Sequence, residues 1–118
     1  MKVYGIKPWE NEMADIASAW HVHYAIEQIN EMNEWLKTAN KPAQAMLFHI
    51  DVLLMLIRRF PECCSMVKKD LVIEWEKTFN DWFERCGKKI PSEYREGIRE
   101  NARDLFAELK ENWYDLPY

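Results

Sequence analysis

Residues 91–113 read PSEYREGIRENARDLFAELKENW, and this stretch decides the fold class. Its apolar residues recur at every third or fourth position, a spacing that places them on one side of an α-helix. They are Tyr94, Ile98, Ala102, Leu105, Leu109 and Trp113. Pro91 and Ser92 are both suited to the start of a helix. We therefore predict an amphipathic helix over residues 91–113 that packs along this stripe.

Two segments before this stretch have the same helical periodicity. Residues 42–59 carry apolar side chains on nearly all sides, which predicts a helix covered by several neighbours. Residues 63–86 carry a single apolar stripe. Ser65 and Asp70 can each cap the start of that helix. Gly87 is placed to end it in a left-handed turn.

Residues 8–38 predict the longest helix, which is expected to begin near Pro8. Because it is longer than the other helices, we expect it either to be broken near residues 20–23 or to project at one end. Its main apolar stripe comprises Ile16, Ala19, Val22, Ile26, Ile29, Met32 and Leu36. A second stripe, which we expect to widen the buried face, comprises Met13, Ala17, Trp20 and Tyr24.

These four segments predict the fold class. The chain has 118 residues with no composition shift, so residues 1–118 are expected to form one domain. Three Gly and five Pro are few for a protein built from β-turns, which favours helices. Short connections favour antiparallel neighbours. We therefore predict a compact all-α, antiparallel bundle of four main helices, with an irregular helical array as the alternative.

Charge and cysteine content limit the classes of function. The formal net charge of −4 disfavours direct nucleic-acid binding, which needs a basic face. The longest apolar run, residues 43–57, is too short to span a bilayer. Cys63, Cys64 and Cys86 make a poor disulfide framework, and no apolar signal core follows Met1. The sequence therefore predicts a cytoplasmic protein with free thiols and no membrane partner.

A metal- or small-ligand-binding bundle is one hypothesis for function. His23 and Glu27 are four residues apart and share a helical face, and His49 or Asp51 from residues 42–59 could complete a site between facing helices. The Glu-x-x-His motif of di-iron bundles is absent. The alternative interpretation makes His23 and Glu27 a surface pair and His49 a buried imidazole with a hydrogen-bond partner. No cofactor is expected.

The acidic residues suggest a different role for residues 8–38. The 29-residue span 8–36 holds six acidic residues and no Lys or Arg. Glu27, Glu31 and Glu34 lie on one helical face, where like charges repel. The simpler interpretation packs this face beside Arg95, Arg99 and Arg103 of residues 91–113. The alternative presents it to a partner chain.

No catalytic arrangement is evident, because the sequence has no phosphate-binding Gly-rich loop, nucleophile elbow or HExxH motif. We therefore expect a non-enzymatic protein–protein interaction module, a small helical adaptor or regulator, with a homodimer also open. An inhibitor whose acidic helix blocks a basic, nucleic-acid-binding site on a larger complex is the alternative. The expected contact residues are Glu27, Glu31, Glu34, Trp35, Trp113, Tyr114 and Tyr118.

Overall fold

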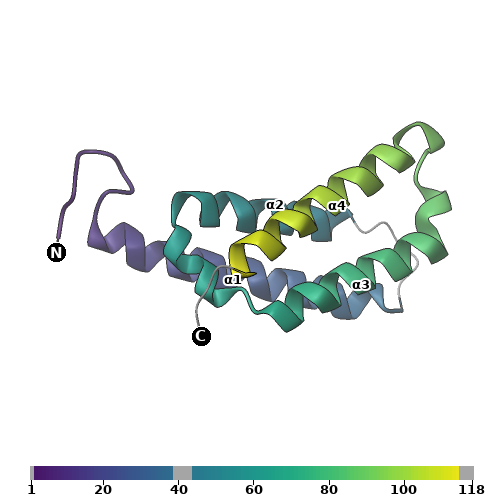
Figure 1. Ribbon diagram of the computed structural model, residues 1–118, viewed down its shortest axis with the longest axis horizontal. Coiled ribbons are helices and arrows are strands. Elements are labelled where there is room, and N and C mark those ends of the chain that lie inside the picture. The colour runs from purple at the N-terminus through teal and green to yellow at the C-terminus, as the bar shows by residue number, and fades with distance from the viewer. Residues whose placement is uncertain (1, 39–43, 115–118) are drawn as a thin grey trace.

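The computed structural model describes residues 2–38 and 44–114, with no side-chain detail for Gln44 or residues 112–114. Those residues form an all-α bundle of four main helices, which confirms the predicted fold class (Figure 1). The helices are α1 (Glu12–Leu36), α2 (Gln44–Arg59), α3 (Lys69–Cys86) and α4 (Ser92–Tyr114). Two 3₁₀ turns, η1 (Pro61–Met66) and η2 (Gly87–Lys89), flank α3.

The four helices form two antiparallel hairpins, α1 with α2 and α3 with α4. The hairpins meet through parallel pairs. Asn30 of α1 bonds to Trp75 of α3, and Leu36, further along α1, bonds to Arg85, further along α3, so these two helices run in the same direction. Helix α2 packs against α4. In the described residues, α1 and α4 share no close backbone contact, so they occupy opposite corners of the bundle. The residues predicted to pair α1 with α4 therefore lie on helices that are not neighbours.

The core lies between the hairpins and takes large apolar side chains from every helix. Helix α3 supplies most of its aromatic volume through the predicted stripe, since Trp75, Phe79 and Trp82 are at most 1% exposed. The Phe79 ring centroid is 5.8 Å from that of Trp82 and 6.2 Å from that of Phe106 on α4. Helix α2 contributes Met46, Ile50, Leu53, Leu54 and Ile57.

The ends of two helices differ from the predicted ones. Helix α1 begins at Glu12, four residues later than expected, because the Asn11 side chain accepts a hydrogen bond from the backbone N–H of Ala14 at 2.8 Å and so caps the helix. Helix α3 begins at Lys69 and not at residue 63, because Pro61 opens the η1 turn first. Helix α1 is continuous to Leu36 and is not broken near residues 20–23. Residues 39–43, between α1 and α2, lie outside the described residues. Helix α4 runs from Ser92 to Tyr114.

The junction between α3 and α4 also differs from the prediction. Neither Ser65 nor Asp70 caps α3, whose N-cap residue is Lys68. Gly87 does not adopt a left-handed conformation, since its φ is −59° and the chain continues into η2. The guanidinium of Arg95 instead donates hydrogen bonds to the carbonyls of Gly87, Lys88 and Ile90 at 2.9–3.1 Å. These bonds hold the first turn of α4 against the η2 turn that follows α3.

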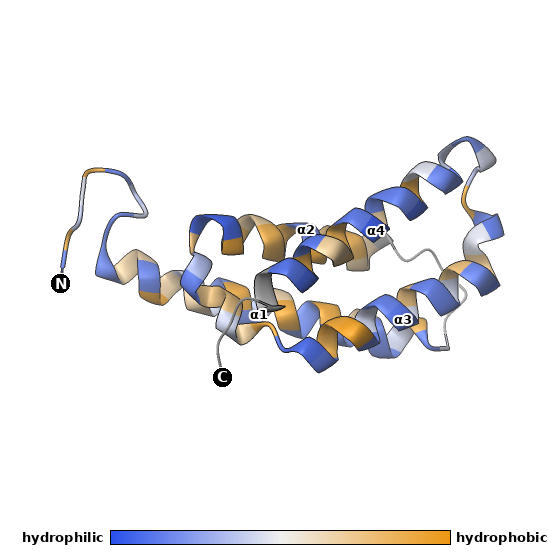
Figure 2. Cartoon of the chain, viewed as in Figure 1, coloured by the Kyte–Doolittle hydropathy of each residue, from blue (hydrophilic) through white to orange (hydrophobic). Residues whose placement is uncertain are grey.

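Two predicted apolar stripes face solvent. The second stripe of α1 was expected to widen the buried face, but Met13, Trp20 and Tyr24 are 56%, 71% and 59% exposed. Helix α2 is likewise not covered on all sides, since Phe48 and Met55 are exposed. Figure 2 shows hydrophobic colour on the projecting first turns of α1 as well as between the helices. Ile16 and Tyr94, which were expected on the buried stripes of α1 and α4, are also exposed, at 49% and 59%. The predicted stripes are therefore buried only in part.

The bundle is elongated because α1 extends beyond its partners. The principal extents are 51 × 31 × 21 Å, and the radius of gyration is 15.9 Å. A spherical domain of this length would have a radius of gyration of about 13.5 Å. Figure 1 shows the N-terminal turns of α1 and the loop before them lying outside the bundle. None of the described helices is long and apolar enough to cross a membrane.

Candidate interaction surface

One side of α1 faces solvent along its whole length and combines two kinds of side chain. We call this side the outer face of α1. Its N-terminal half is apolar and aromatic, and its C-terminal half is acidic. The apolar half comprises Met13, Ile16, Ala17, Trp20 and Tyr24, and the acidic half comprises Glu27, Glu31 and Glu34 with Trp35 beside them; all of these residues are exposed.

The opposite side of α1 fixes this orientation by packing into the bundle. Trp20 and Ile29 are nine residues apart, about two and a half helical turns, so they point in opposite directions. Ile29 is fully buried and Trp20 is 71% exposed. The hydroxyl of Ser18 lies 3.6 Å from the thiol of Cys63 in η1, which fastens the inner side of α1 near its N-terminal half.

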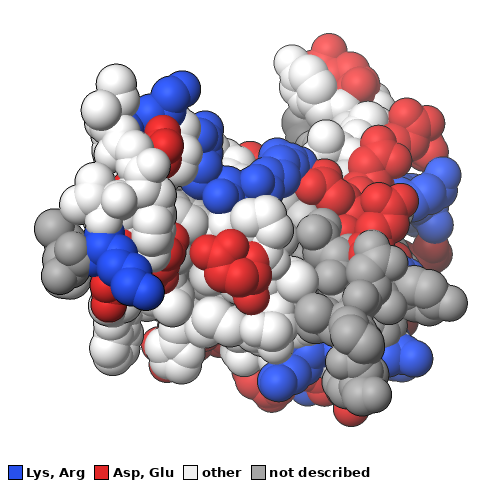
Figure 3. All heavy atoms as spheres, turned by 60° about the vertical axis from the view of Figure 1, so that its left-hand side comes forward, with Lys and Arg blue, Asp and Glu red and all other residues white. Residues whose placement is uncertain are grey.

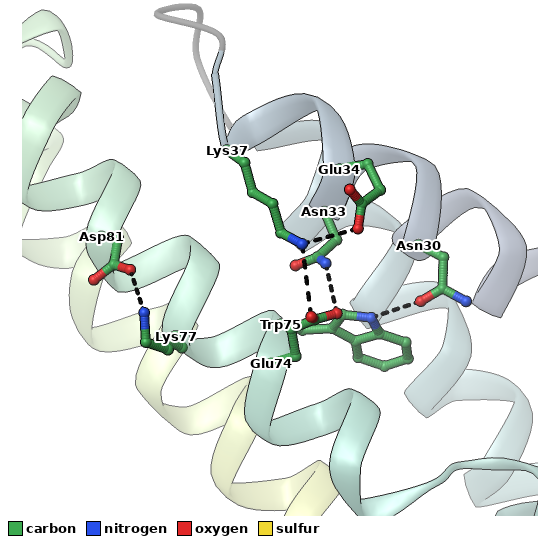
Figure 4. Close-up of polar contacts among 8 residues, drawn as sticks. All are labelled: Asn30, Asn33, Glu34, Lys37, Glu74, Trp75, Lys77 and Asp81. Carbon is green, nitrogen blue, oxygen red and sulfur yellow. Dashed lines mark hydrogen bonds and ion pairs between the residues drawn. The ribbon is translucent and has the colours of Figure 1, made fainter.

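Polar contacts between α1 and α3 hold the C-terminal half of α1 in the same orientation (Figure 4). The indole N–H of Trp75 donates to Asn30 Oδ1 at 2.8 Å. The amide of Asn33 donates to Glu74 Oε2 at 2.9 Å. Glu27 and Glu31 remain exposed, whereas Glu34 lies nearer to α3 and shares Lys37 with Glu74.

The acidic half of the outer face carries little compensating positive charge. His23 Nε2 lies 2.9 Å from Glu27 Oε1, with both side chains 56% exposed. Lys37 Nζ lies 2.9 Å from Glu34 Oε1 and 3.6 Å from Glu74 Oε1. The hydrogen bond to Glu34 raises the pKa of the Lys37 ammonium group. No ion pair of Glu31 occurs among residues 2–38 and 44–111.

Among the described side chains, Arg95 and Arg99 of α4 form no ion pairs with this acidic half. Arg95 is occupied by the carbonyls at the end of α3. Arg99 pairs with Glu84 of α3 at 3.4 Å and lies over the Phe83 ring. In Figure 3 acidic groups gather on the right-hand side of the view. Much of the surface toward the viewer is uncharged.

The other predicted contact residues have mixed outcomes. Trp35 is 40% exposed next to the acidic half. Trp113 and Tyr114 belong to the last turn of α4, but their side chains lie outside the description, as does the whole of Tyr118. The predicted tail contacts therefore stay predictions.

The predicted metal ligands are not brought together in the described residues. His23 and Glu27 form a surface pair on α1. His49 is half-buried on α2 with its ring centroid 5.5 Å from that of Phe48, and Asp51 is exposed. The described part of the chain contains no group of three His, Cys, Asp or Glu side chains able to hold a metal ion.

Two hollows on the surface are large enough to hold a small molecule. A hollow of about 320 Å³ beside the end of α1 is lined by charged side chains, including Lys37, Glu74, Lys77 and Asp81, which already pair with one another or with Glu34. A second of about 470 Å³ lies between α2 and α4 and is lined mainly by residues of α4. Neither brings a nucleophile together with a positioned base. The outer face of α1 is the more distinctive feature.

A comparison of the chain with protein-family models, curated proteins and solved structures finds no match.

The apolar half of the outer face was missed from the sequence. Trp20 and Tyr24 were assigned to the core because they belong to a helical stripe. The signal was nevertheless present, since that stripe is half a helical circumference away from Val22 and Ile29. One helix buries both of two opposite stripes only when it is surrounded, and α1 contacts α2, α3 and η1 alone among the described elements.

Proposed function

We propose that this protein is a non-enzymatic protein–protein interaction module that binds its partner through the outer face of α1. The observation that carries the proposal is the exposure of Met13, Ile16, Trp20 and Tyr24 at helical spacing on a helix that packs into the core from Ser18 onward. Contiguous apolar surface of this kind marks contact sites in folded proteins. Trp and Tyr are also the residue types that dominate binding energy at interfaces.

The geometry matches a known mode of recognition in which an amphipathic helix lays one face into a groove of its partner. Anchor residues in that mode recur at intervals of three and four, as Met13, Ile16, Trp20 and Tyr24 do. The helix is already formed and held by the bundle, so binding would cost little conformational entropy. The proposal assigns no catalytic residue.

Trp20→Ala is expected to weaken partner binding at least tenfold without lowering stability, because a central aromatic anchor carries much of the binding energy while its exposed side chain carries little folding energy. A partner is first isolated on immobilised wild-type protein from extracts of the source cell and then purified. Its affinity is measured by titration calorimetry for the wild type and for Trp20→Ala.

Tyr94→Ala is the matched control, since Tyr94 on α4 is an aromatic residue that is also 59% exposed. It should bind the partner as tightly as the wild type. If Tyr94→Ala abolishes binding and Trp20→Ala has no effect, the interaction surface lies on α4 and the proposed site is wrong.

We further propose that the protein works in a reducing, cytoplasmic environment, which the state of its thiols supports. Cys63, Cys64 and Cys86 are thiols and not disulfides, and Cys63 and Cys86 are buried. Dithiothreitol is therefore expected to leave the Tm unchanged in a thermal melt. A fall of several degrees on reduction would reveal a stabilising disulfide and contradict the assignment.

A further inference from the structure

We propose that the partner is a protein with a groove whose apolar floor continues into a strip of Lys and Arg side chains, so that it binds both halves of the outer face of α1. This inference rests on the proposed function and adds the chemistry of the partner to it. Three observations support it: the register of the two halves, the small amount of positive charge beside the acidic half, and the charge pattern that other occupants would need.

The two halves of the outer face lie in one line along the helix. Trp20 and Glu27 are seven residues apart, close to two full turns, so they point the same way. From Met13 to Glu34 the face is about 32 Å long. A single straight groove can therefore contact the aromatic anchors and the carboxylates at once, without any rearrangement of α1.

The acidic residues of this face are spaced so that they destabilise an isolated helix. Glu27 and Glu31 are four residues apart, and Glu34 is three residues further on, so their carboxylates repel one another. Glu34 lies in the last turn of α1, where the helix dipole favours cations, and Lys37 at the C-cap pairs with it. The exposed aromatic residues and the row of acidic residues, of which Glu31 has no ion pair in the described residues, break local folding rules on the same face. Such violations gather at functional sites.

A basic groove fits these charges better than the other occupants do. Helices that bind membrane surfaces carry Lys and Arg on their polar side, and residues 8–36 contain neither. A second copy must match its own charges across a two-fold axis. Antiparallel pairing about Trp20 would place Glu27 of one copy opposite Met13 of the other and next to its Glu12, and residues 8–36 supply no Lys or Arg to neutralise Glu27.

The test uses a synthetic helical peptide of roughly 20 residues, with Leu along one face and Lys confined to one half of that face. A second peptide replaces Lys by Gln. The full-length protein is titrated with each by fluorescence anisotropy at about 50 mM and about 200 mM salt. We expect the Leu/Lys peptide to bind more tightly than the Leu/Gln peptide, and its advantage to shrink as salt rises.

Glu31→Lys should weaken binding of the Leu/Lys peptide at least tenfold at low salt and leave binding of the Leu/Gln peptide unchanged. Its melting curve should match that of the wild type, because Glu31 is exposed and has no basic partner in the described residues. Glu100→Lys is the control, since it makes the same charge change at an exposed position of α4. It should leave binding of both peptides unchanged.

The outcomes separate this inference from the proposed function. If Trp20→Ala abolishes peptide binding and Glu31→Lys does not alter it, the interaction surface stands and the basic partner is wrong. If neither variant alters it, both proposals fail. Binding to phosphatidylcholine–phosphatidylglycerol vesicles that Trp20→Ala removes would overturn the inference in favour of a membrane. A dimer by light scattering that Trp20→Ala dissociates would overturn it in favour of a second copy.

Discussion

Leu53→Ala is expected to lower the free energy of unfolding by roughly 2–5 kcal/mol, a large share of the total stability of a domain this size. Leu53 is fully buried in α2, the helix that packs against both α1 and α4. Removing its branched end loses apolar burial and leaves a cavity, because the surrounding helices cannot collapse completely. Urea unfolding followed by circular dichroism measures the change.

Met55→Ala provides the matched control on the same helix. Met55 is 58% exposed, so its truncation should change the unfolding free energy by less than about 0.5 kcal/mol. The two variants together test which side of α2 faces the core. A change below about 1 kcal/mol for Leu53→Ala, with a larger one for Met55→Ala, would show that the helix is rotated from the orientation described.

The parts of the fold that a single apolar stripe determines could be predicted from the sequence. Helix α3 is the clearest case, because Trp75, Phe79 and Trp82 lie on one side and all are buried. Charged residues fill its other side, so only one orientation buries the aromatics. The exposure of Glu27 and Glu31 follows from the same reasoning.

The parts that depend on which helices are neighbours could not be predicted. Helical periodicity gives the direction of each side chain about its own axis but not how many other helices surround that axis. Phe48 on α2 and Trp20 on α1 were therefore assigned to the core although the bundle covers neither. The role of Arg95 was hidden for the same reason, since it depends on α4 folding back along the end of α3.

Asn33→Leu is expected to raise the free energy of unfolding by roughly 1–3 kcal/mol, the usual cost of burying an unpaired polar group. Asn33 is 1% exposed, and its Oδ1 has no hydrogen-bond partner in the described structure. Its amide N–H bonds to Glu74, whose side chain is 49% exposed and can return to water. Leucine has a similar volume and removes the unpaired oxygen.

Asn30→Leu should have the opposite sign, although the two asparagines are neighbours on α1. Asn30 Oδ1 accepts the indole N–H of Trp75, which is fully buried. Removing this acceptor leaves a buried donor unpaired and should lower the free energy of unfolding by roughly 1–3 kcal/mol. Urea denaturation of both variants gives the comparison directly, and equal shifts in one direction would contradict this account of the α1–α3 contact.

The asparagine pair also tests whether stability and binding are separable in α1. Asn33 projects toward α3 (Figure 4), whereas Trp20 and Glu31 of the outer face are exposed. Asn33→Leu should therefore stabilise the bundle without changing the affinity for the Leu/Lys peptide. A stabilised variant that loses the peptide would mean that the α1–α3 contact shifts when the partner binds, because a rigid outer face would be unaffected by a change on the opposite side of the helix.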